Sequence, residues 1–78
     1  IYEISIFPNP VKNTLGFSLD ELNNNATACI FSIDGKLITS QSIESLQAII
    51  NTESLTKGMY VLHIKNGGQS LTSKFIKE

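Results

Sequence analysis

The last quarter of the chain constrains the fold most, because apolar and polar residues alternate there around glycines. Residues 55–77 read LTKGMYVLHIKNGGQSLTSKFIK. In the run Met59–Lys65, the even-numbered residues are apolar and share one face, because successive strand side chains point to opposite sides. Gly58 precedes this run, residues 66–68 form a short polar connection, and a second run ends at residues 74–77. Two such runs joined by a glycine-containing loop predict a β-hairpin that closes a small β domain.

Five further strand-like runs precede this hairpin, at residues 1–7, 14–19, 26–33, 36–43 and 46–50. Asp34-Gly35 separates the third run from the fourth and predicts a tight hairpin with a type I′ turn, which needs positive φ at both central residues. Both faces of the third run are apolar, which either burial on both faces or a β-bulge would explain. About seven short strands predict an antiparallel β-sandwich. The predicted core residues are Ile4, Leu15, Phe17, Ile30, Tyr60, Leu62 and Phe75.

The totals fit one domain spanning residues 1–78 and exclude several classes of function. Seventy-eight residues leave no room for a second domain. The net charge is −1 without a basic cluster, so a nucleic-acid partner is not expected. No apolar run approaches the roughly 18–20 residues of a membrane-spanning helix. The chain begins at Ile1 without a methionine, which suggests a piece of a longer protein.

The sequence contains no set of residues suited to catalysis or cofactor binding. His63 has no second histidine, cysteine or carboxylate at ligand spacing and is expected on a strand surface. Cys29 is the single cysteine, which excludes an internal disulfide and favours a half-buried structural thiol. Asp20 and Glu21 could bind calcium, but adjacent carboxylates point apart on an extended segment, so a solvated loop is favoured. We therefore expect no enzyme, metal, cofactor or small-molecule substrate.

Four short motifs follow one another in an order that indicates a family. A stiff corner of alternating prolines, which lack amide donors, comes first. A glycine turn, a Gly-x-Tyr motif and a terminal strand flanked by lysines follow. Together they resemble the C-terminal sorting domain of the type IX (Por) secretion system of Bacteroidetes, type A subclass. The resemblance implies that the residues read as a signal are Pro8, Asn9, Pro10, Gly35, Gly58, Tyr60, Lys74, Phe75, Ile76 and Lys77.

The same resemblance implies a fold, a function and partners. Domains of this family look like seven-stranded immunoglobulin-like sandwiches at the C-terminus of larger secreted proteins, where they address an N-terminal cargo domain. The implied partners are the outer-membrane translocon, a shuttle protein and a sortase, which usually cleaves the domain and can join the cargo to the cell surface. The implied location is therefore secreted or on the cell surface, reached through the periplasm and the outer membrane. In the terminal strand, we expect Lys74 and Lys77 to present their charges while Phe75 anchors the segment.

Two other functions fit a small β-sandwich. A carbohydrate-binding module would need exposed aromatic rings to stack on sugars, and the chain has no tryptophan. A structural immunoglobulin-like spacer of a multidomain extracellular protein would need no site at all. Lys74 and Lys77 also have a simpler interpretation, since lysines on an edge strand prevent edge-to-edge aggregation.

Overall fold

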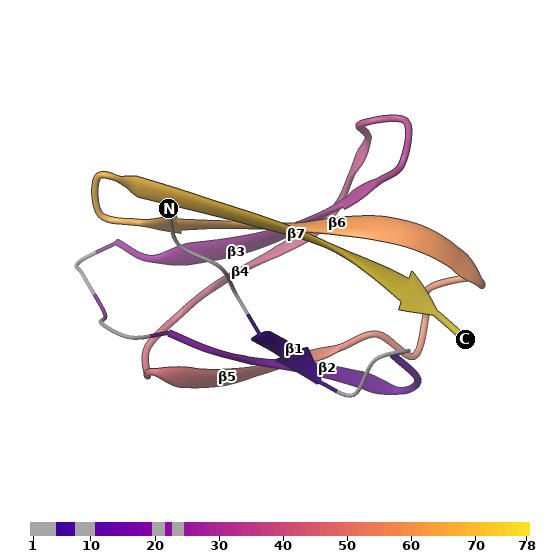
Figure 1. Cartoon of the computed structure of the whole chain (residues 1–78), viewed down its shortest axis with the longest axis horizontal. Helices are drawn as coiled ribbons and strands as arrows, with labels where there is room; N and C mark the ends of the chain where they lie inside the picture. Colours follow the sequence, from indigo (N-terminus) through magenta and orange to yellow (C-terminus); the bar gives the residue numbers. More distant parts are fainter. Residues whose placement is uncertain (1–4, 8–10, 20–21, 23–24) are drawn as a thin grey trace.

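The fold is a sandwich of two antiparallel β-sheets, seen in a computed structural model that describes residues 5–7, 11–19, 22 and 25–78 (Figure 1). Within these ranges the strands are β1 (Ser5–Phe7), β2 (Thr14–Ser18), β3 (Thr27–Ser32), β4 (Leu37–Ser42), β5 (Gln47–Asn51), β6 (Gly58–Asn66) and β7 (Gln69–Lys77). One sheet has the order β1-β2-β5 and the other β4-β3-β6-β7. This arrangement confirms the predicted all-β antiparallel sandwich. No described segment forms a helix that could cross a membrane.

The hairpin of β6 and β7 is the longest element, as the alternating pattern of the last quarter predicted. Nine residue pairs join the two strands, from Gly58 opposite Lys77 to Asn66 opposite Gln69. The connecting turn is Gly67-Gly68, in which Gly67 has φ 68° and Gly68 has no positive φ. These signs are those of a type II′ turn, which matches the right-handed twist of the strands that it joins. β6 also pairs with β3, so it forms the centre of the four-stranded sheet.

β4 extends the four-stranded sheet instead of joining the opposite one. In a constant-type immunoglobulin domain the fourth strand lies in the sheet of the first two strands. Here β4 pairs with β3 across their hairpin, and β5 crosses to the other sheet to pair with β2. The result is a sheet whose outer face is wide enough to carry side chains from four strands.

The hydrophobic core lies between the two sheets and contains the predicted residues that the structure describes. Leu15, Phe17 and Leu62 are fully buried, and Ile30, Tyr60 and Phe75 are nearly so. Ile4 was also predicted to lie in the core, but it falls outside the described residues. Among the described residues, the buried cluster is Val11, Leu15, Phe17, Leu19, Ala26, Ala28, Ile30, Ile43, Ile50, Tyr60, Leu62, Ile64, Leu71 and Phe75.

The β3–β4 turn differs from the predicted type I′ turn. The Gly35 amide donates a hydrogen bond to the Ser32 carbonyl (2.9 Å), and the Ser32 amide donates to the Lys36 carbonyl (2.8 Å). Gly35 has φ 92°, but Asp34 does not have positive φ. The loop therefore contains three residues, 33–35, with glycine at its last, left-handed position, which is the next commonest hairpin geometry. The prediction was wrong because Asp-Gly serves both loop lengths equally well.

A β-bulge lies beside the third run, but neither it nor burial on both faces explains the apolar residues on both faces of that run. Ile30 pairs with Thr39 but Phe31 pairs with Leu37, so Ile38 of β4 has no partner in the ladder. The extra residue lies in β4, not in β3. Of the two faces of β3, only the one with Ala28 and Ile30 is buried, whereas Cys29 and Phe31 on the other are half-buried. Bulges increase the local twist of a strand pair, and this one lies at the base of the projecting hairpin (Figure 1).

Replacement of Leu62 by alanine tests the assignment of the faces of β6. Leu62 is fully buried, so Leu62→Ala should lower the free energy of unfolding by about 2–5 kcal/mol, because it removes apolar contacts and leaves a cavity. Urea titration measures the change. Ile49→Ala is the matched control: Ile49 is 69% exposed on β5, and its loss should change stability by less than about 0.5 kcal/mol. An unchanged midpoint for Leu62→Ala would mean that the two faces of β6 are reversed.

Candidate functional site

The three sequence motifs that the structure describes, namely the glycine turn, the Gly-x-Tyr motif and the terminal strand, lie at one end of the sandwich. Strand register sets Ser32 opposite Tyr60, Tyr60 opposite Phe75, and Gly58 opposite Lys77. Val11, which follows the proline corner, forms a parallel bridge with Lys77. We call this region the C-terminal end; it comprises residues 11–12, 32–36, 57–60 and 74–78. The predicted signal residues Pro8, Asn9 and Pro10 lie outside the described residues.

Tyr60 holds the start of β6 against both its own loop and the last strand. Its ring stacks on Phe75 with 5.7 Å between the centroids and 23° between the planes. Its hydroxyl donates a hydrogen bond to the Thr56 carbonyl (2.8 Å) and lies 3.1 Å from the Thr56 hydroxyl. A tyrosine whose hydroxyl reaches back to the backbone a few residues upstream resembles the tyrosine corner of immunoglobulin domains. Tyr60 therefore shapes this end from within, since only 7% of it is exposed.

Gly58 supplies the backbone conformation that starts β6. Its φ is +149°, a value that residues with a Cβ rarely adopt, although no heavy atom lies within 4 Å of where a Cβ would be. The requirement is therefore conformational and not steric. The two fixed positions of the Gly-x-Tyr motif act together. Gly58 adopts the backbone conformation at which β6 begins, and Tyr60 stabilises the preceding loop through its hydrogen bond to Thr56.

Thr52 anchors the loop that leads to Gly58 through hydrogen bonds to the segment before β2. This threonine is fully buried, and its hydroxyl donates to the Lys12 carbonyl (2.9 Å) while its amide donates to the Asn13 carbonyl (2.9 Å). Leu55 is half-buried against the core. The segment between β5 and β6 is thereby tied to the segment that follows Val11. Nothing in the sequence pattern indicated this tie.

Gly35 lies at the tip of the β3–β4 hairpin, which projects from the same end (Figure 1). It is exposed and makes the turn possible through its positive φ. Beside it, the Ser32 hydroxyl donates to the Asp34 carboxylate. That hydrogen bond, followed by smaller contributions from backbone amides and Lys36, holds the pKa of Asp34 below its usual value. Ser32 thus has a local role at the turn.

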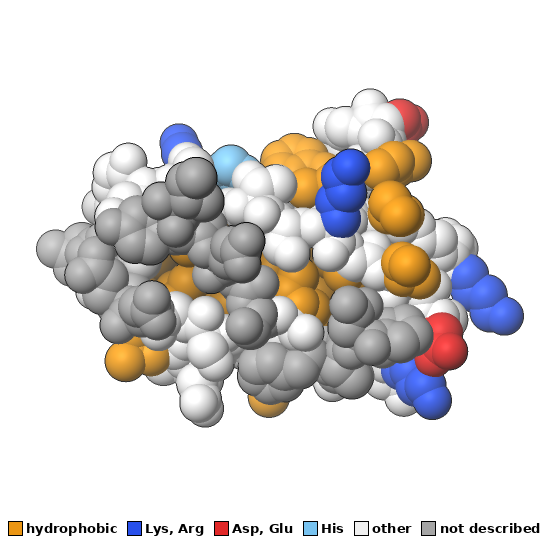
Figure 2. Space-filling model, viewed as in Figure 1, with side chains coloured by type: hydrophobic (Ala, Val, Ile, Leu, Met, Phe, Trp, Pro, Cys, Tyr) orange, Lys and Arg blue, Asp and Glu red, His pale blue; other side chains and the backbone are white. Residues whose placement is uncertain are grey.

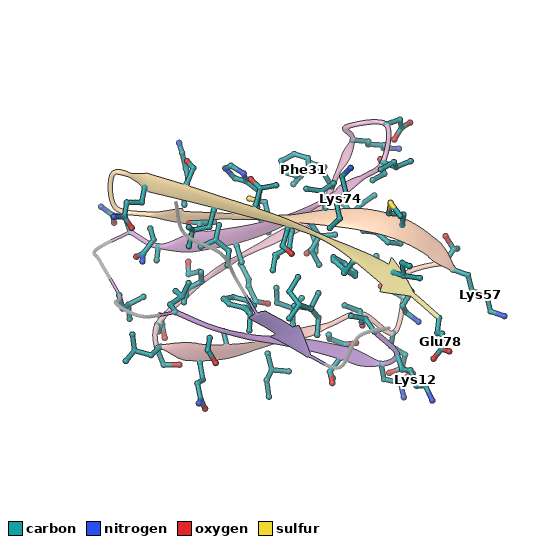
Figure 3. The ribbon with its side chains drawn as sticks, viewed as in Figure 1. Lys12, Phe31, Lys57, Lys74 and Glu78 are labelled. Carbon is teal, nitrogen blue, oxygen red and sulfur yellow. The ribbon has the colours of Figure 1, made fainter. Side chains whose placement is uncertain are left out.

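Val11 locks the end of the last strand. Its amide donates to the Ile76 carbonyl (2.8 Å), and the Glu78 amide donates back to the Val11 carbonyl (2.8 Å). The adjacent Lys12 ammonium lies 3.8 Å from the Glu78 carboxylate on the surface, and Figure 3 shows both side chains at this end. This contact could not be predicted, because a single bridge between distant segments leaves no local pattern in the sequence. It joins the segment after the proline corner directly to the terminal strand.

The terminal strand divides its residues between the core and the surface. Phe75 is 2% exposed and anchors the strand, as expected, whereas Lys74 and Ile76 point outward. Lys77 corrects the expectation that both lysines present their charges: it is only 8% exposed, and its ammonium donates to the Glu78 carbonyl (3.1 Å). The reason is strand alternation, since positions 74 and 77 must lie on opposite faces. Of the two lysines, Lys74 alone can meet a partner.

The remaining candidate residues form no reactive cluster. The His63 ring lies half-buried on β6, with Nδ1 3.1 Å from the Thr72 hydroxyl and its edge toward Phe31. Cys29 is a free, half-buried thiol, as predicted. Among the described residues, no three His, Cys, Asp or Glu side chains lie close enough together to bind a metal ion. Asp20 and Glu21, considered for calcium, are outside the described residues.

The aromatic side chains offer no platform for a sugar ring in the part of the chain that the structure describes. Phe17, Tyr60 and Phe75 are buried in the core. Phe31 is half-buried, with its ring 6.3 Å from that of His63 in an edge contact. A carbohydrate-binding module needs rings that lie open to solvent, so these positions do not favour that alternative.

The chain is similar in sequence to a family of sorting domains and to part of an enzyme. Residues 5–78 match the family described as "Secretion system C-terminal sorting domain". The funoran endo-beta-hydrolase of Wenyingzhuangia aestuarii is 33% identical over 73 residues, which cover 91% of this chain and 10% of that enzyme. The chain thus spans about a tenth of the length of this curated relative. The family match confirms the resemblance that the four motifs indicated.

Two solved structures share the fold. PorZ, an essential surface component of the type IX secretion system of Porphyromonas gingivalis, has a TM-score of 0.80 and 13% identity, over 96% of this chain and 11% of PorZ. A DUF3244-family protein from Bacteroides vulgatus has a TM-score of 0.78 and 21% identity, over 96% of this chain and 83% of that protein. The latter is described as an immunoglobulin-like β-sandwich. These likenesses confirm the immunoglobulin-like fold.

Replacement of Gly58 tests whether its backbone conformation shapes the C-terminal end. Gly58→Ala should lower the free energy of unfolding by about 1–3 kcal/mol, because alanine is strained at this φ. Gly68→Ala is the control: that glycine also has open space around it but lacks positive φ, so alanine should leave stability unchanged or raise it by up to about 1 kcal/mol. Thermal unfolding of both variants measures the difference. Equal stability of the two variants would contradict a conformational role for Gly58.

Proposed function

Because the chain belongs to the family of secretion system C-terminal sorting domains, we propose that its folded C-terminal end is what the export machinery recognises. The chain is a type IX sorting signal. It directs export across the outer membrane, to the cell surface or the medium. Such a signal must be read by another protein, and this requires a surface of defined shape more than a reactive group.

The convergence of the motifs supports this proposal. A linear signal would need only the terminal residues, whereas here the terminal strand is held by partners from distant parts of the chain. Gly58 lies opposite Lys77, Tyr60 stacks on Phe75, and Val11 bonds to both sides of position 77. The Gly-x-Tyr motif and the segment that follows the proline corner therefore both help to position one short segment. A signal of this kind is displayed by a fold and is not an extended peptide.

The signal residues take two different roles under this proposal. Four of them set the shape of the C-terminal end. Tyr60 and Phe75 are buried in the core, Lys77 is a buried lysine, and Gly58 supplies a backbone conformation. The exposed positions 74 and 76 are the ones that a partner can contact. The Gly35 hairpin frames the same end of the molecule.

The cargo and the named partners extend the proposal beyond this chain. The related funoran endo-beta-hydrolase is about ten times longer than the matching region, which supports a cargo domain that precedes the sorting domain in the same protein. Under this proposal the chain itself catalyses no reaction, which agrees with the lack of a metal-binding cluster among the described residues. Under this proposal the outer-membrane translocon and a shuttle protein bind the domain, and a sortase removes it once the cargo has crossed.

A fusion protein tests the sorting function. We expect that a reporter with an N-terminal Sec signal and the 78 residues at its C-terminus reaches the surface or medium of a type IX-competent host. In a host without the type IX translocon, the same fusion should remain in the periplasm. Fractionation followed by immunoblotting measures the distribution, and the reporter without the 78 residues is the control.

The outcome that contradicts the sorting function is equal export of the fusion by both hosts. Retention of the fusion in the periplasm of the competent host would contradict it as well, provided that the purified fusion is folded. Deletion of residues 74–78 is a poor substitute for this test. It would remove the buried Phe75 and the backbone bonds to Val11, so it would disturb folding together with recognition.

A further inference from the structure

The outer face of the four-stranded sheet divides into an apolar half and a polar half. The apolar half lies toward the C-terminal end, and we call it the apolar patch; it consists of Phe31, Leu37, Met59, Val61 and Ile76 around Lys74. The polar half lies toward the β6–β7 turn and consists of Thr27, Cys29, Ser40, Ser42, His63, Lys65, Ser70 and Thr72. The division follows from the strand register alone.

The patch is continuous across all four strands. Leu37 pairs with Phe31, Phe31 with Val61, and Val61 with Lys74. Met59 and Ile76 form the next pair toward the end of the sheet. Directly opposed residues in a sheet have Cβ atoms about 4.5–5.5 Å apart, so these side chains touch or nearly touch.

The patch is open to solvent. Leu37, Met59 and Ile76 are 51%, 44% and 50% exposed, which is unusual for apolar residues that are neighbours. Figure 2 shows apolar side chains gathered over the β3–β4 hairpin and the end of β7. Figure 3 shows Phe31 and Lys74 on this outer side of the sheet. Contiguous exposed apolar surface on a small domain marks an interaction site.

The charges of this face are all positive. Its strand positions carry Lys65, Lys74 and the titratable His63, and no carboxylate, although the whole chain has a net charge of −1. The carboxylates that the structure describes lie in loops and at the chain end: Asp34, Glu44, Glu53 and Glu78. Asp34, on the hairpin tip beside the patch, already accepts a hydrogen bond from Ser32. Among the described residues, no carboxylate lies on the same face as Lys74, which is in the middle of apolar side chains.

We propose that the apolar patch is the docking surface for a protein of the export machinery, which presents apolar side chains around a carboxylate that pairs with Lys74. This inference rests on the proposed sorting function and specifies its recognition surface. Charge complementarity selects the partner: a lysine inside an apolar contact must meet an acidic group when water is removed. The exposed apolar residues around Lys74 provide the contact area. The single charge of Lys74 fixes where the partner protein sits on that area.

Two other occupants of the patch fit the structure less well. A second copy of the chain, packed through the same patch with two-fold symmetry, would bring Lys74 close to its own counterpart, and like charges repel. An anionic lipid surface would attract Lys65 and Lys74 alike, although only Lys74 lies among apolar side chains. A partner protein with one carboxylate opposite Lys74 would match the uneven distribution of apolar and polar residues on this face. Neither a second copy nor a lipid surface would match it.

Charge reversal at Lys74 tests the proposal in the reporter fusion. Lys74→Glu keeps a charge on this edge strand, so protection against aggregation is retained, but it repels an acidic partner. We expect the exported fraction to fall about tenfold or more, because interface charges are costly when reversed. Lys65→Glu, on the same face but in the polar half, should be exported like the parent fusion.

Replacement of an exposed isoleucine by serine, inside and outside the patch, tests the apolar contacts. Ile76→Ser should also lower export severalfold, by about the amount typical of a central apolar contact. Ile49→Ser is its control, because Ile49 is 69% exposed on the opposite sheet. The melting temperature of each purified fusion shows whether the variant is folded. A folded Lys74→Glu or Ile76→Ser variant that accumulates in the periplasm supports the proposal.

Each alternative result overturns the proposal in a different way. If the parent fusion is exported and the folded Lys74→Glu and Ile76→Ser variants are exported equally well, the patch is not the docking surface. If Lys65→Glu reduces export as much as Lys74→Glu, the face acts through diffuse attraction to anionic lipid. A parent dimer in light scattering that Ile76→Ser separates assigns the patch to a second copy. Failure of the parent fusion itself would instead contradict the sorting function.

Discussion

The pairing of β6 with β7 is the interaction on which the rest of the structure depends. It extends over nine residue pairs and places Tyr60 directly against Phe75, so the last strand is both a sheet edge and a wall of the core. A chain of this size buries a modest share of its surface, and both aromatic rings belong to the buried part, since Tyr60 is 7% exposed and Phe75 is 2% exposed. The same hairpin therefore serves both stability and recognition. The inward side chains of β7 pack in the core, and its outward side chains are available to a partner.

The alternating pattern was enough to predict the strands, the sandwich and six of the seven core residues, because side-chain alternation in strands is a local rule. The type of the β3–β4 turn and the exposure of Lys77 were not correctly predicted. Asp-Gly suits more than one loop length. The charge of a lysine suggests exposure, whereas its position two residues after Phe75 places it inward with that residue. At Lys77 the alternation of the strand was the better guide.

The site was predicted as a set of motifs but not as a surface. Of the motif residues that the structure describes, Tyr60 and Phe75 lie in the core and Gly58 sets the backbone. Lys77 is also buried, whereas Gly35, Lys74 and Ile76 are exposed. The bridge from Val11 to the terminal strand and the apolar patch both depend on which distant segments become neighbours, and no local pattern contains that information. The pairing register of the strands brings the described motifs to one end of the molecule. It also gives that end a face that is apolar and carries positive charge.

Site-specific photo-crosslinking in secreting cells tests the central claim most directly. A photoreactive residue would replace Ile76 in the apolar patch or Ile49 on the opposite sheet, within the full fusion. The account predicts that position 76 forms an adduct with an outer-membrane protein of the type IX machinery, that this adduct is lost when Lys74 is changed to glutamate, and that position 49 forms none. Equal adducts from both positions, or an adduct at 76 that the charge reversal leaves unchanged, would contradict recognition through this face.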